Sequence, residues 1–176
     1  MLGDSFTFID KNSLEDFGIK VVAMDSFLPQ KRERKINIPG VSGMYDYGAK
    51  CYEEREITIT CVLTKKLTRA ETREIAYWLS RKGKLILWDE PYKYYIAEIY
   101  DSVEIDTMPK EVMREFELHF KAEPFAYKDV NYTQINEVVT KVNYQGTAET
   151  PCLLVLKNPT NQPIKIITIT ATRKRR

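Results

Sequence analysis

The segment YEEREITITCVL, residues 52–63, decides the fold class of this chain. From residue 57 onward apolar side chains alternate with polar ones, so that Ile57, Ile59, Cys61 and Leu63 share one face. Alternation with a period of two predicts a strand that buries one face and exposes the other. We therefore expect an antiparallel sheet to be built around this segment.

The same kind of pattern recurs on both sides of this segment. Further strands are predicted within residues 4–10, 17–28, 84–99 (a hairpin that turns at residues 89–92), 102–106 and 113–125. Such a series of strands with one helix among them indicates a mainly β (α+β) protein. The expected architecture is an antiparallel β-sandwich or open barrel.

The helix is predicted at about residues 68–82. Thr68 and Glu71 have the spacing of a capping box, which satisfies backbone N–H groups at a helix start. Apolar residues follow at helical spacing toward residue 79. The expected end lies at residues 81–83, where two cations oppose the helix dipole and a glycine follows.

The chain is expected to divide into a first domain at residues 1–127, a polar connector at 128–149 and a C-terminal part at 150–176. The sequence of this C-terminal part predicts two strands that form a β-hairpin. Because a lone hairpin is marginal in water, it would pack on the first domain, pair with another subunit or begin an incomplete second β domain.

Charge and composition exclude several classes of protein. With 27 basic and 25 acidic residues, the net charge of +2 does not indicate a binder of nucleic acid or anionic membranes. The first residues, MLGDSFTFIDKNS, lack the basic and apolar regions of a signal peptide. No apolar run approaches the ~18 residues of a membrane span. We therefore expect synthesis in the cytoplasm and no membrane insertion.

The stretch RERKINIPGVSGMYDYG, residues 32–48, raises the question of a phosphate site. Phosphate loops carry G-x-x-x-x-G-K-[ST], or G-x-G-x-x-G at the start of a helix. Here Gly40 and Gly43 are followed by neither Lys-Ser/Thr nor a predicted helix. The favoured interpretation is a turn at Pro39-Gly40 that shapes a connection between two strands.

The sequence gives little support to catalytic chemistry. His119 is the single histidine and lies on the polar face of its predicted strand, with no nucleophile motif to accompany it. Zinc sites need several His and Cys residues at suitable spacing, and C-x-x-C is absent. We predict no catalytic, cofactor-binding or metal-binding residues and no enzymatic activity.

Clustered carboxylates and aromatic residues leave an alternative open. Glycosidases use carboxylate pairs, and aromatic side chains on a sheet either stack ligands or anchor subunit interfaces. The residues concerned are Glu53, Glu54, Glu56, Asp89 and Glu90, with Trp88, Tyr92, Tyr94 and Tyr95. The alternative to an assembly role is a small carbohydrate-binding or cell-wall-acting β domain.

Four stretches, in order, resemble one protein family. They are SFTFIDKNSLEDFGIKV (5–21), RKINIPGVSGMYDYG (34–48) with Y-x-x-R-x-I-x-I after it (52–59), LILWDEPYKYYIAEI (85–99) and FKAEPFAY (120–127). In order, spacing and intervening helix they are similar to the distal tail proteins of phages and prophages, which belong to the siphovirus-type tail tip or baseplate hub. The C-terminal part is short for that family.

The resemblance implies a structural protein of the virion tail. It would form a ring, expected to be a homo-hexamer, at the distal end of the tail tube, and join the tube protein to the tail-associated hub protein. Receptor-binding proteins are a further implied partner, and DNA would only pass through the central channel. The candidate subunit-contact and structural residues are Arg34, Ile36, Pro39, Gly40, Gly43, Tyr45, Tyr47, Asp89, Pro91, Tyr94 and Tyr95.

Overall fold

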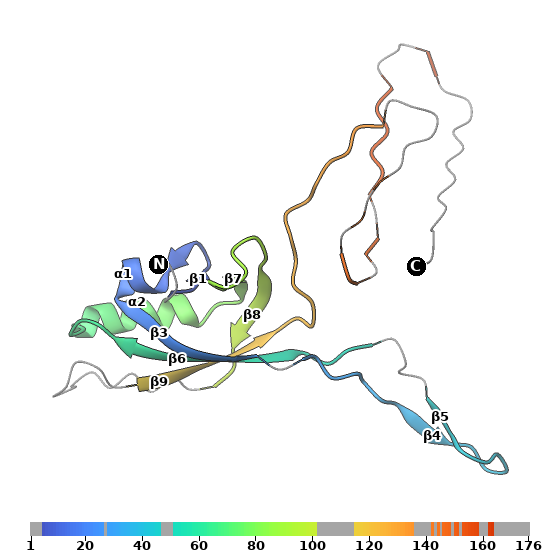
Figure 1. Ribbon diagram of the computed structural model, residues 1–176, viewed down its shortest axis with the longest axis horizontal. Coiled ribbons are helices and arrows are strands. Elements are labelled where there is room, and N and C mark those ends of the chain that lie inside the picture. The colour runs from blue at the N-terminus through green and yellow to red at the C-terminus, as the bar shows by residue number, and fades with distance from the viewer. Residues whose placement is uncertain are drawn as a thin grey trace. The chain divides into compact units, whose positions relative to one another are not determined.

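Figure 1 shows the computed structural model of the chain. It describes residues 5–26, 28–46, 51–101, 115–135, 142, 144, 146–148, 150–151, 153–158 and 162–163. The chain divides into two compact units, Met1–Ile135 and Asn136–Arg176, and each is described by itself.

The first unit is built around a seven-stranded antiparallel sheet with the strand order β2-β1-β7-β8-β9-β6-β3. Its strands are β1 (Thr7–Phe8), β2 (Lys11–Asn12), β3 (Ile19–Ser26), β6 (Arg55–Leu63), β7 (Gly83–Ile86), β8 (Tyr95–Ile99) and β9 (Glu115–Ala122). The expectation of a mainly β protein with antiparallel strands is confirmed. The strand predicted at residues 102–106 lies outside the described residues.

The sheet curls over its own core. Phe8 of β1 and Phe120 of β9 lie three places apart in the strand order, which in a flat sheet would separate them by about 14 Å. Their ring centroids are only 5.3 Å apart. The part of the sheet that contains β1 therefore folds back over β9, in agreement with the predicted sandwich or open barrel.

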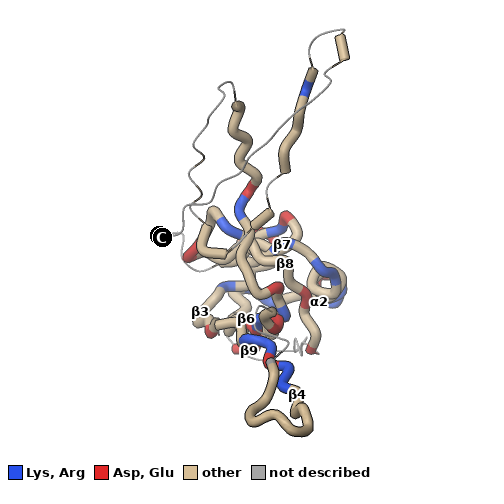
Figure 2. Tube along the Cα trace, turned by 90° about the vertical axis from the view of Figure 1, so that its right-hand side faces the viewer, with Lys and Arg blue, Asp and Glu red and all other residues tan. Residues whose placement is uncertain are grey.

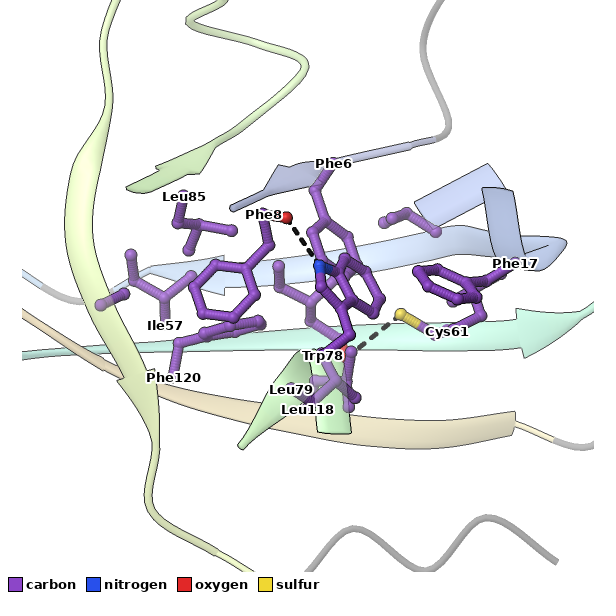
Figure 3. Close-up of a cluster of buried hydrophobic side chains, with 14 of the residues drawn as sticks. Phe6, Phe8, Phe17, Ile57, Cys61, Trp78, Leu79, Leu85, Leu118 and Phe120 are labelled. Atoms are coloured by element: carbon purple, nitrogen blue, oxygen red, sulfur yellow. Dashed lines mark hydrogen bonds between the residues drawn. The ribbon is translucent and has the colours of Figure 1, made fainter. Parts of the chain in front are cut away.

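The buried side chains form one cluster inside this curl (Figure 3). Ile57, Ile59 and Cys61 are fully buried, as their alternation predicts. Burial raises the pKa of the Cys61 thiol to about 12. At the centre, Trp78 packs against three phenylalanine rings, and its Nε1 donates a hydrogen bond to the carbonyl oxygen of Phe8 at 2.6 Å.

Helix α2 (Arg69–Leu79) contributes Trp78 to this core, and its start agrees with the prediction. Thr68 and Glu71 form both hydrogen bonds of the capping box. The predicted end at residues 81–83 is wrong, because the helix stops at Leu79 and Gly83 begins β7. A Cβ atom on Gly83 would overlap the side chain of Ile9, so packing against β1, and not a helix cap, requires this glycine.

A second helix, α1 (Ser13–Phe17), was not predicted from the sequence. It has five residues, too few to show a helical repeat of apolar positions. Asn12 caps its start, accepting hydrogen bonds from the N–H groups of Leu14 and Glu15, and Gly18 ends it in the left-handed conformation with φ 69°. Asn12 and Gly18 are nevertheless local signals of a helix start and a helix end.

Between β3 and β6 the chain leaves this sheet and forms a two-stranded ribbon, here called the arm (residues 28–54; Figure 1). Within the described part of the chain, its strands β4 (Lys35–Asn37) and β5 (Met44–Asp46) pair only with each other. Helices α1 and α2 and the seven-stranded sheet are called the body. Every described residue from 30 to 45 is exposed, whereas the body holds the core.

In the C-terminal unit, the first strand of the predicted hairpin is not found, because residues 153–158 have no strand conformation. The second predicted strand lies outside the described residues. Within the described part of this unit, the hydroxyl of Tyr144 donates a hydrogen bond to the carbonyl oxygen of Ala148 at 2.6 Å. Across the described residues of both units, no helix is long and apolar enough to cross a membrane.

Candidate assembly interface

The backbone of the arm is held by hydrogen bonds between its two sides. Near the body, the N–H of Arg32 donates to the carbonyl oxygen of Cys51 at 2.9 Å, and the N–H of Glu53 donates to Gln30 at 2.8 Å. Farther out, β4 and β5 pair from Lys35–Asp46 to Asn37–Met44. The arm is therefore a defined ribbon and not an irregular loop.

The turn at the end of the arm depends on its glycines. The N–H of Val41 donates to the carbonyl oxygen of Ile38 at 3.2 Å, which closes the turn around Pro39 and Gly40. Gly40 has φ 84° and Gly43 has φ 98°, in the region that side chains disfavour. A Cβ atom on either would meet nothing within 4 Å. These glycines set the direction of the backbone at the turn. The stretch does not have the sequence of a phosphate loop, because no Lys-Ser/Thr follows the glycines.

Exposed apolar side chains gather at the tip of the arm. Met44 is 66% exposed, Val41 59% and Tyr45 57%. With Ile38, Ser42 and Gly43 these residues line a shallow hollow of about 230 Å³. Figure 2 shows the tip free of charged residues, which concentrate nearer the body. A cluster of exposed apolar side chains is typical of an interaction site.

Ion pairs hold the root of the arm. The guanidinium of Arg32 binds both carboxylate oxygens of Glu53, at 2.7 and 3.0 Å. These hydrogen bonds lower the pKa of Glu53 and raise the pKa of Arg32. Glu54 forms an ion pair with Lys121 of β9, in which Oε2 and Nζ are 3.0 Å apart. Two carboxylates of the predicted cluster thus bind cations of their own chain, which does not favour the glycosidase interpretation.

Arg55 and Tyr95 join the root of the arm to the core. The Nη1 of Arg55 donates to the hydroxyl of Tyr95 at 2.9 Å, and the guanidinium lies 5.2 Å from the centre of the tyrosine ring. Tyr95 is only 6% exposed, and this burial raises the pKa of its hydroxyl. Tyr95, one of the candidate subunit-contact and structural residues, therefore belongs to the core and stabilises the fold.

The turn between β7 and β8 carries other candidates. Asp89 and Pro91 are exposed. The ring of Tyr94 stacks on that of Tyr127 at 5.8 Å, and their backbones exchange two hydrogen bonds at 2.9 and 2.8 Å. Lys84 lies over Tyr94 with its Nζ 4.5 Å from the ring centre. Contacts within the chain therefore occupy Tyr94.

The segment that follows β9 also contacts the arm. Phe125 packs edge-to-face against Tyr52, with ring centroids 5.1 Å apart. Together with the Tyr94–Tyr127 pairing, this contact fixes the exit from the sheet beside the root of the arm. Sequence patterns gave no signal for these pairings, because each joins positions that are far apart in the chain.

The candidate residues thus fall into separate groups. Six lie on the arm, namely Arg34, Ile36, Pro39, Gly40, Gly43 and Tyr45, and the structure brings them together on one ribbon. Tyr47 lies outside the described residues. Sequence reasoning missed Ile38, Val41 and Met44, although apolar residues between and beside two turn glycines are a readable signal.

His119 lies on the outer face of β9. Its Nδ1 is 3.3 Å from the Oγ1 of Thr58, and its Nε2 is 3.6 Å from a carboxylate oxygen of Glu117. Within the part of the chain that the structure describes, no three His, Cys, Asp or Glu residues are grouped so that they could hold a metal ion. The arm is therefore the feature that best marks a functional surface.

A family model described as the phage tail protein RIFT-related domain matches residues 11–122, more than half of the chain. The chain belongs to this family of phage tail proteins. The match spans the body and the whole arm. It confirms the resemblance to phage tail proteins that the sequence motifs carry. A comparison with curated proteins gives no match.

Among solved structures, the chain is similar to Dit of phage SPP1, which is described as a paradigm of the hub adsorption apparatus in phages that infect Gram-positive bacteria. The similarity has a TM-score of 0.53 at 16% sequence identity, so it shows a shared fold. It covers 72% of this chain and 52% of Dit. The tail protein described here thus spans about half the length of the solved relative.

Proposed function

We propose that this phage tail protein is a structural subunit of a ring, a homo-hexamer, at the distal end of the tail tube. The observation that carries the proposal is the arm, a ribbon with an exposed apolar tip in a chain of the tail-protein family. In this proposal residues 1–127 form the ring, the arm makes contacts between subunits, and the protein acts as a scaffold without catalytic activity.

The physics of ring formation supports this role for the arm. In a cyclic ring, one surface of each subunit meets a different surface of the next. β4 and β5 pair only with each other, so the tip can bury its apolar side chains only against another molecule or another part of the chain. A paired ribbon also presents backbone edges on which a neighbour can add a strand. The arm of one subunit thus docks on the body of the next.

The ring connects the components of the tail. One side meets the tail tube protein and the other side meets the tail-associated hub protein, with receptor-binding proteins as further partners. DNA passes through the central opening. The subunit is made in the cytoplasm of the bacterial host and functions in the virion tail.

Light scattering coupled to size exclusion, together with negative-stain microscopy, tests the proposal on the full chain. We expect rings for the wild-type protein and monomers for Ile38→Asp/Met44→Asp, because these changes place charges at the apolar tip. The matched control is Val130→Asp, which adds a charge at a residue that is 73% exposed outside the arm. Pull-down of the tail tube and hub proteins completes the test.

A wild-type chain that stays monomeric at all concentrations and binds neither tail protein would overturn the proposal. Rings that form equally well from Ile38→Asp/Met44→Asp would leave the ring but remove the arm from its interface.

A further inference from the structure

The outer face of α2 carries an arginine stripe, formed by Arg69, Arg73 and Tyr77, and Arg81 follows just beyond the end of the helix. The three helical residues follow one another at intervals of four and lie on one side of the helix, turned away from its buried face. All four are exposed, and Tyr77 is 67% exposed. The guanidinium of Arg81 lies 5.1 Å from the centre of the Tyr77 ring.

The carboxylates of α2 do not neutralise this stripe. Glu71 binds Lys65 at 3.0 Å, and Glu74 binds Lys11 at 2.8 Å. Among the described residues, Arg69 and Arg73 have no carboxylate within ion-pair distance. Like charges four residues apart destabilise a helix, so the stripe is a cost to the isolated subunit. Arg and Tyr are also the residues most enriched at the centres of protein interfaces.

The opposite side of the body carries an acidic face. Its residues lie on neighbouring strands and point away from the core: Asp25 of β3, Glu56 of β6, Glu98 of β8, and Glu115 and Glu117 of β9. Two lysines also point outward on this face, Lys20 of β3 and Lys121 of β9, and the Nζ of Lys121 binds Glu54 of the arm at 3.0 Å. None of these five carboxylates has a Lys or Arg partner among the described residues.

The two surfaces face in opposite directions. Trp78 of α2 shares the core with Ile59 of β6 and Leu118 of β9, which places the helix on the inner side of the sheet (Figure 3). The acidic face is the outer side of the same strands. A ring requires two different, complementary surfaces on one subunit, related by a rotation that closes.

We propose that the arginine stripe of one copy of this chain binds the acidic face of the next copy. Arg69 and Arg73 are separated by about 6 Å along the helix axis. Glu115 and Glu117 are separated by about 7 Å along the strand. Two guanidinium–carboxylate pairs therefore form in register, and Tyr77 lies beside them. This interface rests on the proposed ring and identifies the surfaces that close it in addition to the arm.

A second copy fits the stripe better than nucleic acid does. The whole chain has a net charge of only +2, and the acidic face of the same body repels a polyanion. The complementary surface is present on the chain itself, so every subunit supplies both halves of the contact. Binding of duplex DNA to the stripe is the competing outcome that the test below includes.

Charge reversal and its repair test the interface. We expect Arg69→Glu/Arg73→Glu and Glu115→Lys/Glu117→Lys each to weaken ring assembly at least about tenfold, because like charges then meet. The variant that combines all four changes restores opposite charges at each contact, so assembly should return to near the wild-type level. Sedimentation velocity over a concentration series measures assembly, and added salt should weaken the wild-type ring.

Two controls separate the interface from other effects. Lys128→Glu/Lys157→Glu changes the net charge as much as the arginine double variant does, at exposed sites outside both surfaces, and should assemble normally. Circular dichroism checks that each variant folds. If a reversed variant does not fold, Arg69→Gln/Arg73→Gln replaces it and should show a smaller loss of assembly.

The outcomes distinguish this interface from the ring itself. Rings that ignore both reversals, or a combined variant that is as weak as the single reversals, would overturn the interface and leave the ring. A wild-type chain that never assembles would overturn both. Duplex DNA binding that is lost in Arg69→Glu/Arg73→Glu, with rings unaffected, would assign the stripe to nucleic acid instead.

Discussion

The body and the arm are joined through β3 and β6 but bury their side chains differently. In the body, β3 and β6 alternate between the core and the outer surface, and Ile57 and Ile59 are fully buried. In the arm, the continuation of the same two strands exposes every described residue from 30 to 45. The ladder of backbone hydrogen bonds is common to both regions, so it does not explain the difference.

The difference lies in what covers the ribbon. In the body, α2 and the curled end of the sheet supply the partner for the apolar face. In the arm, apolar residues such as Val41 and Met44 face solvent. The body thus covers its own apolar residues, whereas the arm leaves the apolar residues of its tip exposed. Each prediction below changes one of the two regions and asks whether the other responds.

Replacement of residues 32–51 by an Asn-Gly turn is the largest change. The backbone hydrogen bond from Arg32 to Cys51 marks a point at which a short hairpin can close the ribbon. We expect complete loss of rings and an intact body, because the arm contributes nothing to the core. Light scattering checks the first outcome, and cooperative thermal unfolding checks the second. Failure of the shortened chain to fold would show that the body depends on the arm.

Trp78→Ala changes the core of the body and leaves the arm unchanged. Trp78 is 1% exposed and contacts three aromatic rings, so its truncation should lower the free energy of unfolding by about 3–5 kcal/mol. The matched change in the arm is Met44→Ala, which should alter it by less than about 0.5 kcal/mol. Urea unfolding of the monomer measures both. Similar losses for the two variants would contradict the separation of body and arm.

Gly43→Val introduces strain within the arm alone. At φ 98° a side chain costs about 1–3 kcal/mol, and the open space around this glycine confines the effect to the turn. Rings should weaken, while unfolding of the body stays unchanged. Gly43→Asn should keep more assembly, because Asn tolerates positive φ better than Val does. Equal assembly by Gly43→Val and the wild type would make the turn geometry irrelevant.

Glu71→Gln gives the smallest expected effect and tests the body by pH. Hydrogen bonds from the backbone and side chain of Thr68, and one from Lys65, lower the pKa of Glu71 from 4.5 to about 2. Because the folded-state pKa lies below the unfolded value, this carboxylate stabilises the body above pH 4.5, and the contribution is lost as the pH falls toward 2.

The wild-type protein should therefore lose more of its melting temperature than Glu71→Gln does between pH 4.5 and pH 2. The glutamine still accepts the capping hydrogen bond, so the helix is retained. Glu74→Gln on the same helix is the control. Parallel pH curves for Glu71→Gln and the wild type would contradict the role assigned to the charge.

Sequence patterns predicted the body well, because its strands obey a period of two and its long helix has a capping box. They predicted poorly where structure depends on contacts between distant residues. Gly83 was assigned to a helix end, whereas Ile9, which is remote in sequence, decides its role. Tyr95 is one of the candidate subunit-contact and structural residues, and only the coordinates show that Arg55 and the core bury it. The arm was recognised as a connection, and its length and exposed tip required coordinates.

The pairing of β9 with β6 has a mechanical consequence. Arg55, where the arm enters β6, lies opposite Ala122, where the chain leaves β9. Tension between the arm and the exit segment therefore pulls on the same end of the ladder and would open its hydrogen bonds one at a time. The Tyr52–Phe125 and Tyr94–Tyr127 contacts lie at that end, so we expect them to break before the hydrogen bonds of the ladder. Force spectroscopy with handles at residues 41 and 128 would measure the force that opens the ladder, and Phe125→Ala should lower this force.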